Sequence, residues 1–190
     1  RSRFLLEARA MASVRDPHVV QIYAFGEHWG APYFVMEFVE GITVQTWLNQ
    51  LEEKPDLTLA LRMIDDACRG VAAIHAAGAV HRDIKPSNLL LDATFRVRVG
   101  DLGVSDRTQG LGAPSKREIV GTPEFMSPEI VMGLETYAEL AYRTDVYSLA
   151  SVAYEMLTGC APFTGDDARA RMMARIDHEP ARPSERRPDL

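Results

Sequence analysis

Hydrophobic and polar positions divide the first part of the chain into segments of two periods. Apolar side chains recur every three or four residues through residues 1–14, which is the spacing of one helix face. Pro17 ends this helix, because the residue before a proline is pushed out of the helical region. Runs rich in β-branched and aromatic residues follow at 19–23 and 33–38, with a turn-forming stretch at 26–32 between them. We therefore expect two paired strands.

The rest of the chain has mostly helical periodicity. One long apolar stripe runs from Leu57 to Ile74, and Gly78 closes it in the manner of a helix terminator. The other patterned segments are shorter: two strands at 89–91 and 97–99 joined by a turn, an apolar helix at 146–156, and a shorter helix at 167–176.

Two stretches have little periodicity. Residues 100–128 are rich in Gly, Ser and Thr, and a loop of such length is usually functional or disordered. Residues 179–190 contain three prolines, and we expect no closing helix or strand there. Because few strands come first and several helices follow, the predicted fold class is α+β.

Composition and charge exclude several classes of protein. The 190 residues are 46% hydrophobic and carry 21 basic against 27 acidic side chains, which gives a net charge of -6. This acidic balance argues against a nucleic-acid binder, whose affinity depends on clustered Lys and Arg. The chain has no apolar run long enough for a membrane span, no signal peptide, and too few cysteines for a disulfide framework. We therefore expect a cytoplasmic chain without a membrane segment.

Residues 81–88, with the sequence His-Arg-Asp-Ile-Lys-Pro-Ser-Asn, concentrate polar groups between the long helix and a short strand. Asp83 supplies a carboxylate, Lys85 a cation and Asn88 an amide. This set suits phosphoryl transfer, because a carboxylate accepts a hydroxyl proton, an ammonium offsets negative charge and an amide oxygen can ligate Mg²⁺. A solvated turn is the alternative; it would explain the aspartate alone but not the whole octapeptide.

Three further motifs follow this stretch in order. Asp101 begins an Asp-Leu-Gly turn that could hold a metal beside the first loop, residues 121–129 close the long loop, and Asp145 starts the apolar helix. With these motifs in this order, the sequence resembles the eukaryotic-like (Hanks-type) Ser/Thr protein kinases. The bacterial members are the most similar, through phrases at 35–38 and 154–159. The resemblance covers essentially the whole chain.

The resemblance implies a protein-kinase-like two-lobe fold. Residues 1–36 would form part of the small lobe, with one helix and two or three strands, and residues 37–41 the hinge. Residues 42–190 would form the mostly helical large lobe, with the catalytic loop at 81–88 and the activation segment at 101–129.

The resemblance also implies a reaction, the transfer of the γ-phosphate of ATP to protein Ser or Thr hydroxyls with Mg²⁺. Asp83 would be the catalytic base, Lys85 would contact the γ-phosphate, and Asn88 and Asp101 would hold Mg²⁺. Lys85 together with Thr122 is the Ser/Thr pattern rather than the tyrosine one. The implied partners are ATP and a protein substrate.

Nucleotide-binding residues follow from the same resemblance. Glu37 and Val39 would present backbone groups to adenine, Met36 would occupy the gatekeeper position at the back of the nucleotide site, and Leu90 would lie under the ring. Glu7 matches the helix glutamate whose partner is a strand lysine.

Four side chains would stack as the family's regulatory spine: Met11, Ile22, His81 and Leu102, the last standing where the family most often has Phe. Asp145 would tether this stack. Plain core packing predicts the same burial, so both interpretations stay open. His75 is expected to be an ordinary packed or edge histidine.

The resemblance implies one regulatory contact. Arg82, before the catalytic aspartate, marks kinases that are activated when a phosphorylated loop residue pairs with that arginine. Four residues before Thr122 this chain has Glu118, and we hypothesise that Glu118 pairs with Arg82 in place of a phosphate. A solvated loop glutamate beside Arg117 is the simpler interpretation.

Two departures from the family pattern affect the expected activity. No glycine-rich loop and no lysine-bearing strand precede Glu7, so we expect the chain alone to phosphorylate poorly. Glu129 should be an under-compensated carboxylate, because the chain ends before the helix whose arginine usually pairs with it. The protein that contains the chain could still be membrane-anchored, with this domain in the cytosol.

Two other functions are compatible with a kinase-like fold. A pseudokinase or scaffold would bind partners without catalysis, but Asp83, Asn88 and Asp101 are all present. A small-molecule phosphotransferase would lack a peptide-binding segment like residues 121–129. The sequence therefore favours a protein kinase.

Overall fold

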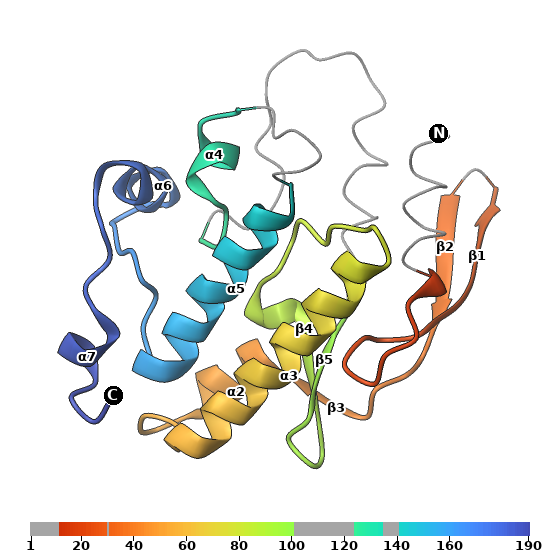
Figure 1. Cartoon of the computed structure of the whole chain (residues 1–190), viewed down its shortest axis with the longest axis horizontal. Coiled ribbons are helices and arrows are strands. Elements are labelled where there is room, and N and C mark those ends of the chain that lie inside the picture. Colours follow the sequence, from red (N-terminus) through yellow and green to blue (C-terminus); the bar gives the residue numbers. More distant parts are fainter. Residues whose placement is uncertain (1–11, 30, 101–123, 135–140) are drawn as a thin grey trace.

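The computed structural model describes residues 12–29, 31–100, 124–134 and 141–190, and places two small antiparallel sheets beside a layer of helices (Figure 1). One sheet is the hairpin of strands β1 (Ile22–His28) and β2 (Ala31–Met36). The other has the order β3-β4-β5, with β3 at Gly41–Thr43, β4 at Leu89–Asp92 and β5 at Val97–Val99. The predicted α+β class is confirmed.

Two long helices, α3 and α5, form the centre of the helical layer and pack against each other, and α3 also packs against β5 (Figure 1). Helix α3 begins where the Asp56 side chain accepts a hydrogen bond of 2.8 Å from the Leu59 amide. It ends just before Gly78, whose φ of +75° suits glycine. The helical elements are α2 (Val44–Gln50), α3 (Leu57–Ala76), the 3₁₀ turn η1 (Pro86–Asn88), α4 (Pro128–Val131), α5 (Ala141–Thr158), α6 (Ala168–Asp177) and α7 (Pro183–Arg186).

The first apolar run does not form one strand, so the prediction for residues 19–23 was wrong in its bounds. Val20 donates to the Val99 carbonyl at 2.9 Å, so the start of the run lies beside β5. Pairing with β2 begins only at Ile22 and continues to His28, which pairs with Ala31, so most of the predicted turn at 26–32 belongs to the strands. A Cβ atom at Gly26 would lie 2.7 Å from Tyr33 Oη, so this glycine makes room for an aromatic cross-strand neighbour.

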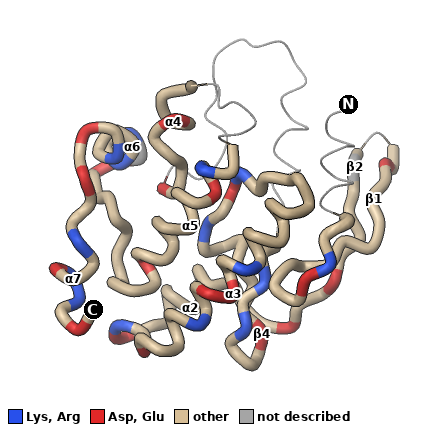
Figure 2. Tube along the Cα trace, viewed as in Figure 1, with Lys and Arg blue, Asp and Glu red and all other residues tan. Residues whose placement is uncertain are grey.

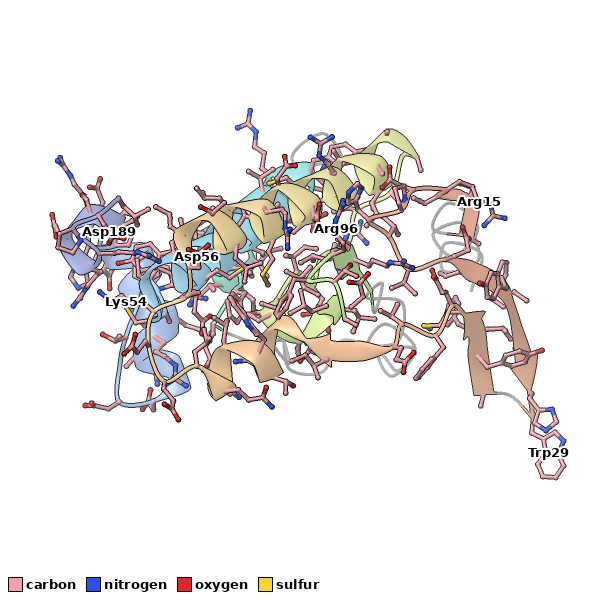
Figure 3. The ribbon with its side chains drawn as sticks, turned by 90° about the horizontal axis from the view of Figure 1, so that it is seen from below. Arg15, Trp29, Lys54, Asp56, Arg96 and Asp189 are labelled. Atoms are coloured by element: carbon pink, nitrogen blue, oxygen red, sulfur yellow. The ribbon has the colours of Figure 1, made fainter. Side chains whose placement is uncertain are left out.

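A polar network fastens this first segment to the helical layer. The buried Asp66 carboxylate of α3 accepts hydrogen bonds from Arg96 Nε at 2.7 Å and Nη2 at 2.9 Å, and from the Val97 amide at 3.2 Å. Arg96 Nη2 also lies 3.0 Å from His18 Nε2. Figure 3 shows Arg96 next to helix α3. The loop before β5 and the segment before β1 therefore meet at one buried carboxylate.

Three short helices were missed from the sequence: α2, α4 and α7. Helix α2 has only a few apolar positions, of which Val44 and Trp47 are buried, so its periodicity is weak. Helix α7 lies in the stretch expected to have no closing element. Just after α7, Arg187 Nη1 donates to the carbonyls of Pro55 at 2.9 Å and Leu157 at 3.2 Å. This arginine fastens the end of the chain to α5 and to the loop before α3.

The core lies between α3, α5 and the three-stranded sheet. Its members include Met63, Ile74, Leu89, Val99 and Met156, all nearly inaccessible to solvent. Acidic and basic residues are interspersed along the described trace (Figure 2). None of the helices in the described ranges is long and apolar enough to cross a membrane.

Candidate active site

The loop between α3 and β4 gathers three of the predicted site residues around one carboxylate. Asn88 Nδ2 donates to the Asp83 carbonyl at 2.8 Å and to Asp83 Oδ2 at 3.0 Å. Lys85 Nζ forms an ion pair with the same Oδ2 at 2.7 Å. Both charged side chains are 19% exposed, so this carboxylate meets a fixed cation, a fixed amide and some solvent. The short η1 turn makes the convergence possible by folding Asn88 back over the loop.

Asp145 holds the start of this loop in place. Its side chain is fully buried at the beginning of α5, where Oδ2 accepts from the His81 amide at 2.8 Å and Oδ1 from the Arg82 amide at 2.7 Å. Arg82 has a φ of +67°, a conformation that non-glycine residues rarely adopt. The two bonds to Asp145 hold the backbone in that conformation.

His75 was not recognised from the sequence as part of this arrangement. Its Nε2 lies 2.8 Å from Asp145 Oδ2. Its ring packs edge-on against Tyr142, with 4.7 Å between the ring centroids. Its place in the last turn of α3 gave no sequence signal of these partners, which belong to α5. His75 therefore links α3 to the same buried carboxylate.

His81 connects the loop to the end of β5. Its Nε2 lies 3.0 Å from the Gly100 carbonyl, and the Asp83 amide donates to its Nδ1 at 3.3 Å. Because Nδ1 accepts a hydrogen bond, the ring carries its proton on Nε2 and donates it to Gly100. The Gly100 amide in turn donates to the Asn88 carbonyl at 2.8 Å. These bonds place the residue before Asp101 directly beside Asn88.

The predicted metal pair is described only in part, because Asp101 lies outside the described residues. Both side-chain bonds of Asn88 use its amide nitrogen, so within the described ranges its amide oxygen has no hydrogen-bond partner. An oxygen of this kind fits Mg²⁺. In the described ranges no group of three or more His, Cys, Asp or Glu side chains could hold a metal ion.

Of the predicted adenine-site residues, Met36, Glu37 and Val39 lie at and after the end of β2, and Leu90 lies in β4. The Glu37 amide donates to the Gln21 carbonyl at 2.8 Å, and its carboxylate forms an ion pair with Arg98 of β5. Met36 is 46% exposed, and Val39 and Leu90 are half-buried. Arg98 was not singled out from the sequence; it fixes the segment between the two sheets to β5.

The other predicted residues divide into two groups. Ile22 and His81 are buried, as either a spine or plain packing requires. Glu129 is half-buried, and no ion pair is found for it within the described ranges. The remaining predicted residues lie outside the described ranges: Glu7, Met11, Asp101, Leu102, Glu118 and Thr122.

Comparisons with known proteins identify the family of the chain. A family model of the protein kinase domain matches residues 1–187. The chain is 35% identical over 194 residues to the serine/threonine-protein kinase PknB of Mycobacterium tuberculosis, across 99% of this chain and 30% of PknB. It is 36% identical over 183 residues to PknL of the same species, across 96% of this chain and 45% of PknL. The chain thus spans less than half the length of these two relatives.

The fold is also similar to that of a solved structure. The crystal structure of a cysteine-to-alanine mutant of the M. tuberculosis PknI kinase domain matches with a TM-score of 0.74 and 24% identity, and the match covers 100% of this chain and 65% of that chain. This likeness shows a shared fold. With the family model matching nearly the whole length, the chain belongs to the protein kinase domain family, and it resembles its bacterial Ser/Thr members.

Proposed function

We propose that this chain is the catalytic part of a Ser/Thr protein kinase that transfers the γ-phosphate of ATP to protein Ser or Thr hydroxyls. The observation that supports this most directly is the cluster around Asp83, where Lys85 and Asn88 both contact the carboxylate. The named activity of relatives such as PknB and PknL points in the same direction.

Each group in the cluster has a distinct task in such a transfer. Asp83 accepts the proton of the substrate hydroxyl as the new phosphorus–oxygen bond forms. Lys85, in an ion pair with Asp83, offsets the negative charge of the transferring group. Asn88 fixes the orientation of Asp83 through its amide nitrogen, so the base meets the hydroxyl in one geometry.

The residues fit the cofactors that the family uses. The Asn88 amide oxygen, with Asp101 beyond the adjacent Gly100, would hold Mg²⁺, which when bound neutralises phosphate charge. Glu37 and Val39 would offer backbone groups to adenine, next to Met36 and above Leu90. Arg98 supports this arrangement by holding the Glu37 side chain.

Phosphate transfer by the full-length protein tests the proposal. The protein is incubated with γ-labelled ATP, Mg²⁺ and dephosphorylated casein, and the labelled amino acids are identified after hydrolysis. We expect label on serine and threonine and none on tyrosine. Nucleotide binding without any transfer would contradict the proposal and favour the pseudokinase or scaffold. Transfer to a small molecule alone would favour a small-molecule phosphotransferase.

Residues 1–190 by themselves should transfer phosphate much more slowly than the full-length protein. They contain no glycine-rich loop to cover the phosphates and no strand lysine to pair with Glu7. The same labelling assay with the isolated chain checks this expectation, and equal rates would contradict it.

A further inference from the structure

The backbone carbonyls of residues 124–126, in the segment that would bind the acceptor peptide, accept hydrogen bonds from side chains. Arg175 Nη2 donates to the Glu124 carbonyl at 2.9 Å, and Arg175 Nη1 donates to the Met126 carbonyl at 3.1 Å. Between them, Ser148 Oγ lies 2.7 Å from the Phe125 carbonyl, and its single proton is shared with the Thr144 carbonyl of its own helix at 2.9 Å. Ser148 belongs to α5 and Arg175 to α6, so side chains of two helices form hydrogen bonds with the same short backbone segment.

This piece of backbone has no regular structure of its own. Residues 124–127 form a turn and an irregular stretch before α4. Among the backbone hydrogen bonds of the described ranges, none is accepted by the carbonyls of residues 124–126. Their direction is therefore set by the side chains of α5 and α6.

The setting of Arg175 suits it to hold two carbonyls. The side chain is only 5% exposed, and its guanidinium carbon lies 5.8 Å from the centre of the Phe163 ring, within cation–π range. Burial lowers the pKa of the guanidinium, but an arginine stays protonated at neutral pH. A planar fork of donors can bond two carbonyls at once, which the single ammonium of a lysine cannot do with the same geometry.

A second arginine of α6 also contacts this segment, at a more exposed position. Arg171, one turn before Arg175, forms an ion pair of 3.1 Å with the Glu124 side chain. These side chains are 28% and 41% exposed, so this pair should contribute little energy. The buried bonds of Arg175 are therefore the main link between α6 and the segment.

We propose that Arg175 is a positioning residue for the protein substrate: from α6 it fixes the backbone of residues 124–126, against which the acceptor peptide is placed. This inference rests on the proposed kinase function. Arg175 acts through the segment: its hydrogen bonds within the described ranges go to the Glu124 and Met126 carbonyls and not to the Asp83 cluster. Its loss should therefore weaken the use of the protein substrate and leave the use of ATP unchanged.

Steady-state kinetics of the full-length protein separates these effects. Arg175→Gln removes the charged fork, Arg175→Lys keeps the charge but not the fork, and Arg169→Gln makes the same chemical change at an exposed site of the same helix. We expect Arg175→Gln to raise KM for casein about tenfold, as two charge-assisted hydrogen bonds are lost, with KM for ATP unchanged. Arg175→Lys should give a smaller rise, and Arg169→Gln none.

Amide hydrogen exchange over residues 124–127 gives a readout that does not depend on catalysis. It should speed up in Arg175→Gln while exchange in β4 and β5 stays the same. An unchanged KM for casein, or equal rises in KM for casein and for ATP, would overturn the proposal. If Arg175→Gln does not fold, Arg175→Lys decides by the same two criteria. Absence of phosphate transfer by the wild-type protein would instead contradict the kinase function itself.

Discussion

At the scale of single residues, Asp145 determines how the catalytic loop is held. One buried carboxylate accepts two backbone amides of the loop and lies within hydrogen-bond distance of His75. Buried backbone N–H groups without partners are costly, so these bonds matter for stability as well as for geometry.

Asp145→Asn should therefore destabilise the protein. An asparagine has one acceptor oxygen, so its NH₂ group would face one of the two loop amides. We expect a loss of about 3 kcal/mol in the free energy of unfolding, measured by urea denaturation. Asp65→Asn, which breaks only an exposed pair with Arg69, serves as the control and should cost less than about 1 kcal/mol. Equal losses in the two variants would contradict the role of Asp145.

Glu155 of α5 predicts a pH dependence with a defined sign. Burial, and next the charge of Glu124, raises the pKa of Glu155 above its ordinary value, and Oε2 has no hydrogen-bond partner in the described ranges. Below the ordinary pKa the carboxyl is protonated in both the folded and unfolded states. As pH rises through the window between the ordinary and the raised pKa, the unfolded state ionises first, so stability is lost.

Glu155→Gln removes this titration. The variant should become progressively more stable relative to wild type as pH rises from 4 to 7, which urea denaturation at several pH values would measure. A stability difference that does not change with pH would show that Glu155 is not destabilised by burial.

The residues of the site were predictable where they are close in sequence. Asp83, Lys85 and Asn88 lie within one loop, so their chemistry could be recognised before any fold was known. His75, Arg98 and Arg175 act through contacts between distant segments, which only tertiary structure reveals. A histidine in a helix turn or an arginine in a short strand carries no local signal of its partner.

At the scale of elements, strongly periodic segments were predicted well and short ones poorly. The apolar stripe of α3 and the hairpin of β4 and β5 match the structure closely. The run at 19–23 was misjudged because local propensity cannot tell which sheet a residue joins. Its first residues lie against β5, and its last ones pair with β2.

Gly70→Ala tests the packing of α3 against His18, just before that run, and against Val99 of β5. Alanine is a better helix former than glycine by about 1 kcal/mol, so propensity alone predicts stabilisation. A Cβ at this position would lie 2.5 Å from the His18 carbonyl oxygen and 2.6 Å from Val99 Cγ2. The His18 carbonyl cannot move aside easily, because it accepts a hydrogen bond of 2.7 Å from the Val99 amide.

We expect the steric clash to outweigh the gain in helix propensity. The free energy of unfolding, measured by heat or urea, should fall by about 1–2 kcal/mol. Gly78→Ala is the matched control, because that site has positive φ but no neighbour within 4 Å. The Gly78→Ala variant should lose stability through backbone strain alone, and its amide exchange in β5 should stay at the wild-type rate. A stabilised Gly70→Ala variant would contradict the described packing.

At the scale of the whole molecule, the helical layer supports both ends of the proposed reaction. Helix α5 provides Asp145 to the loop at 81–88 and Ser148 to residues 124–126, the proposed catalytic loop and substrate platform. Asp145 and Ser148 stand three residues apart on α5, so the proposed base and the proposed substrate platform are anchored on the same helix. Such an arrangement keeps the acceptor hydroxyl and the base in register.

The most direct test of this account is phosphate transfer by the full-length Asp83→Asn protein beside Asp65→Asn and wild type. The change keeps the shape of the side chain but removes the base, so we expect the rate of labelling of casein to fall about a hundredfold or more. Asp65→Asn should stay within about twofold of wild type. If Asp83→Asn transferred phosphate at the wild-type rate, the assignment of this loop as the catalytic centre would be wrong.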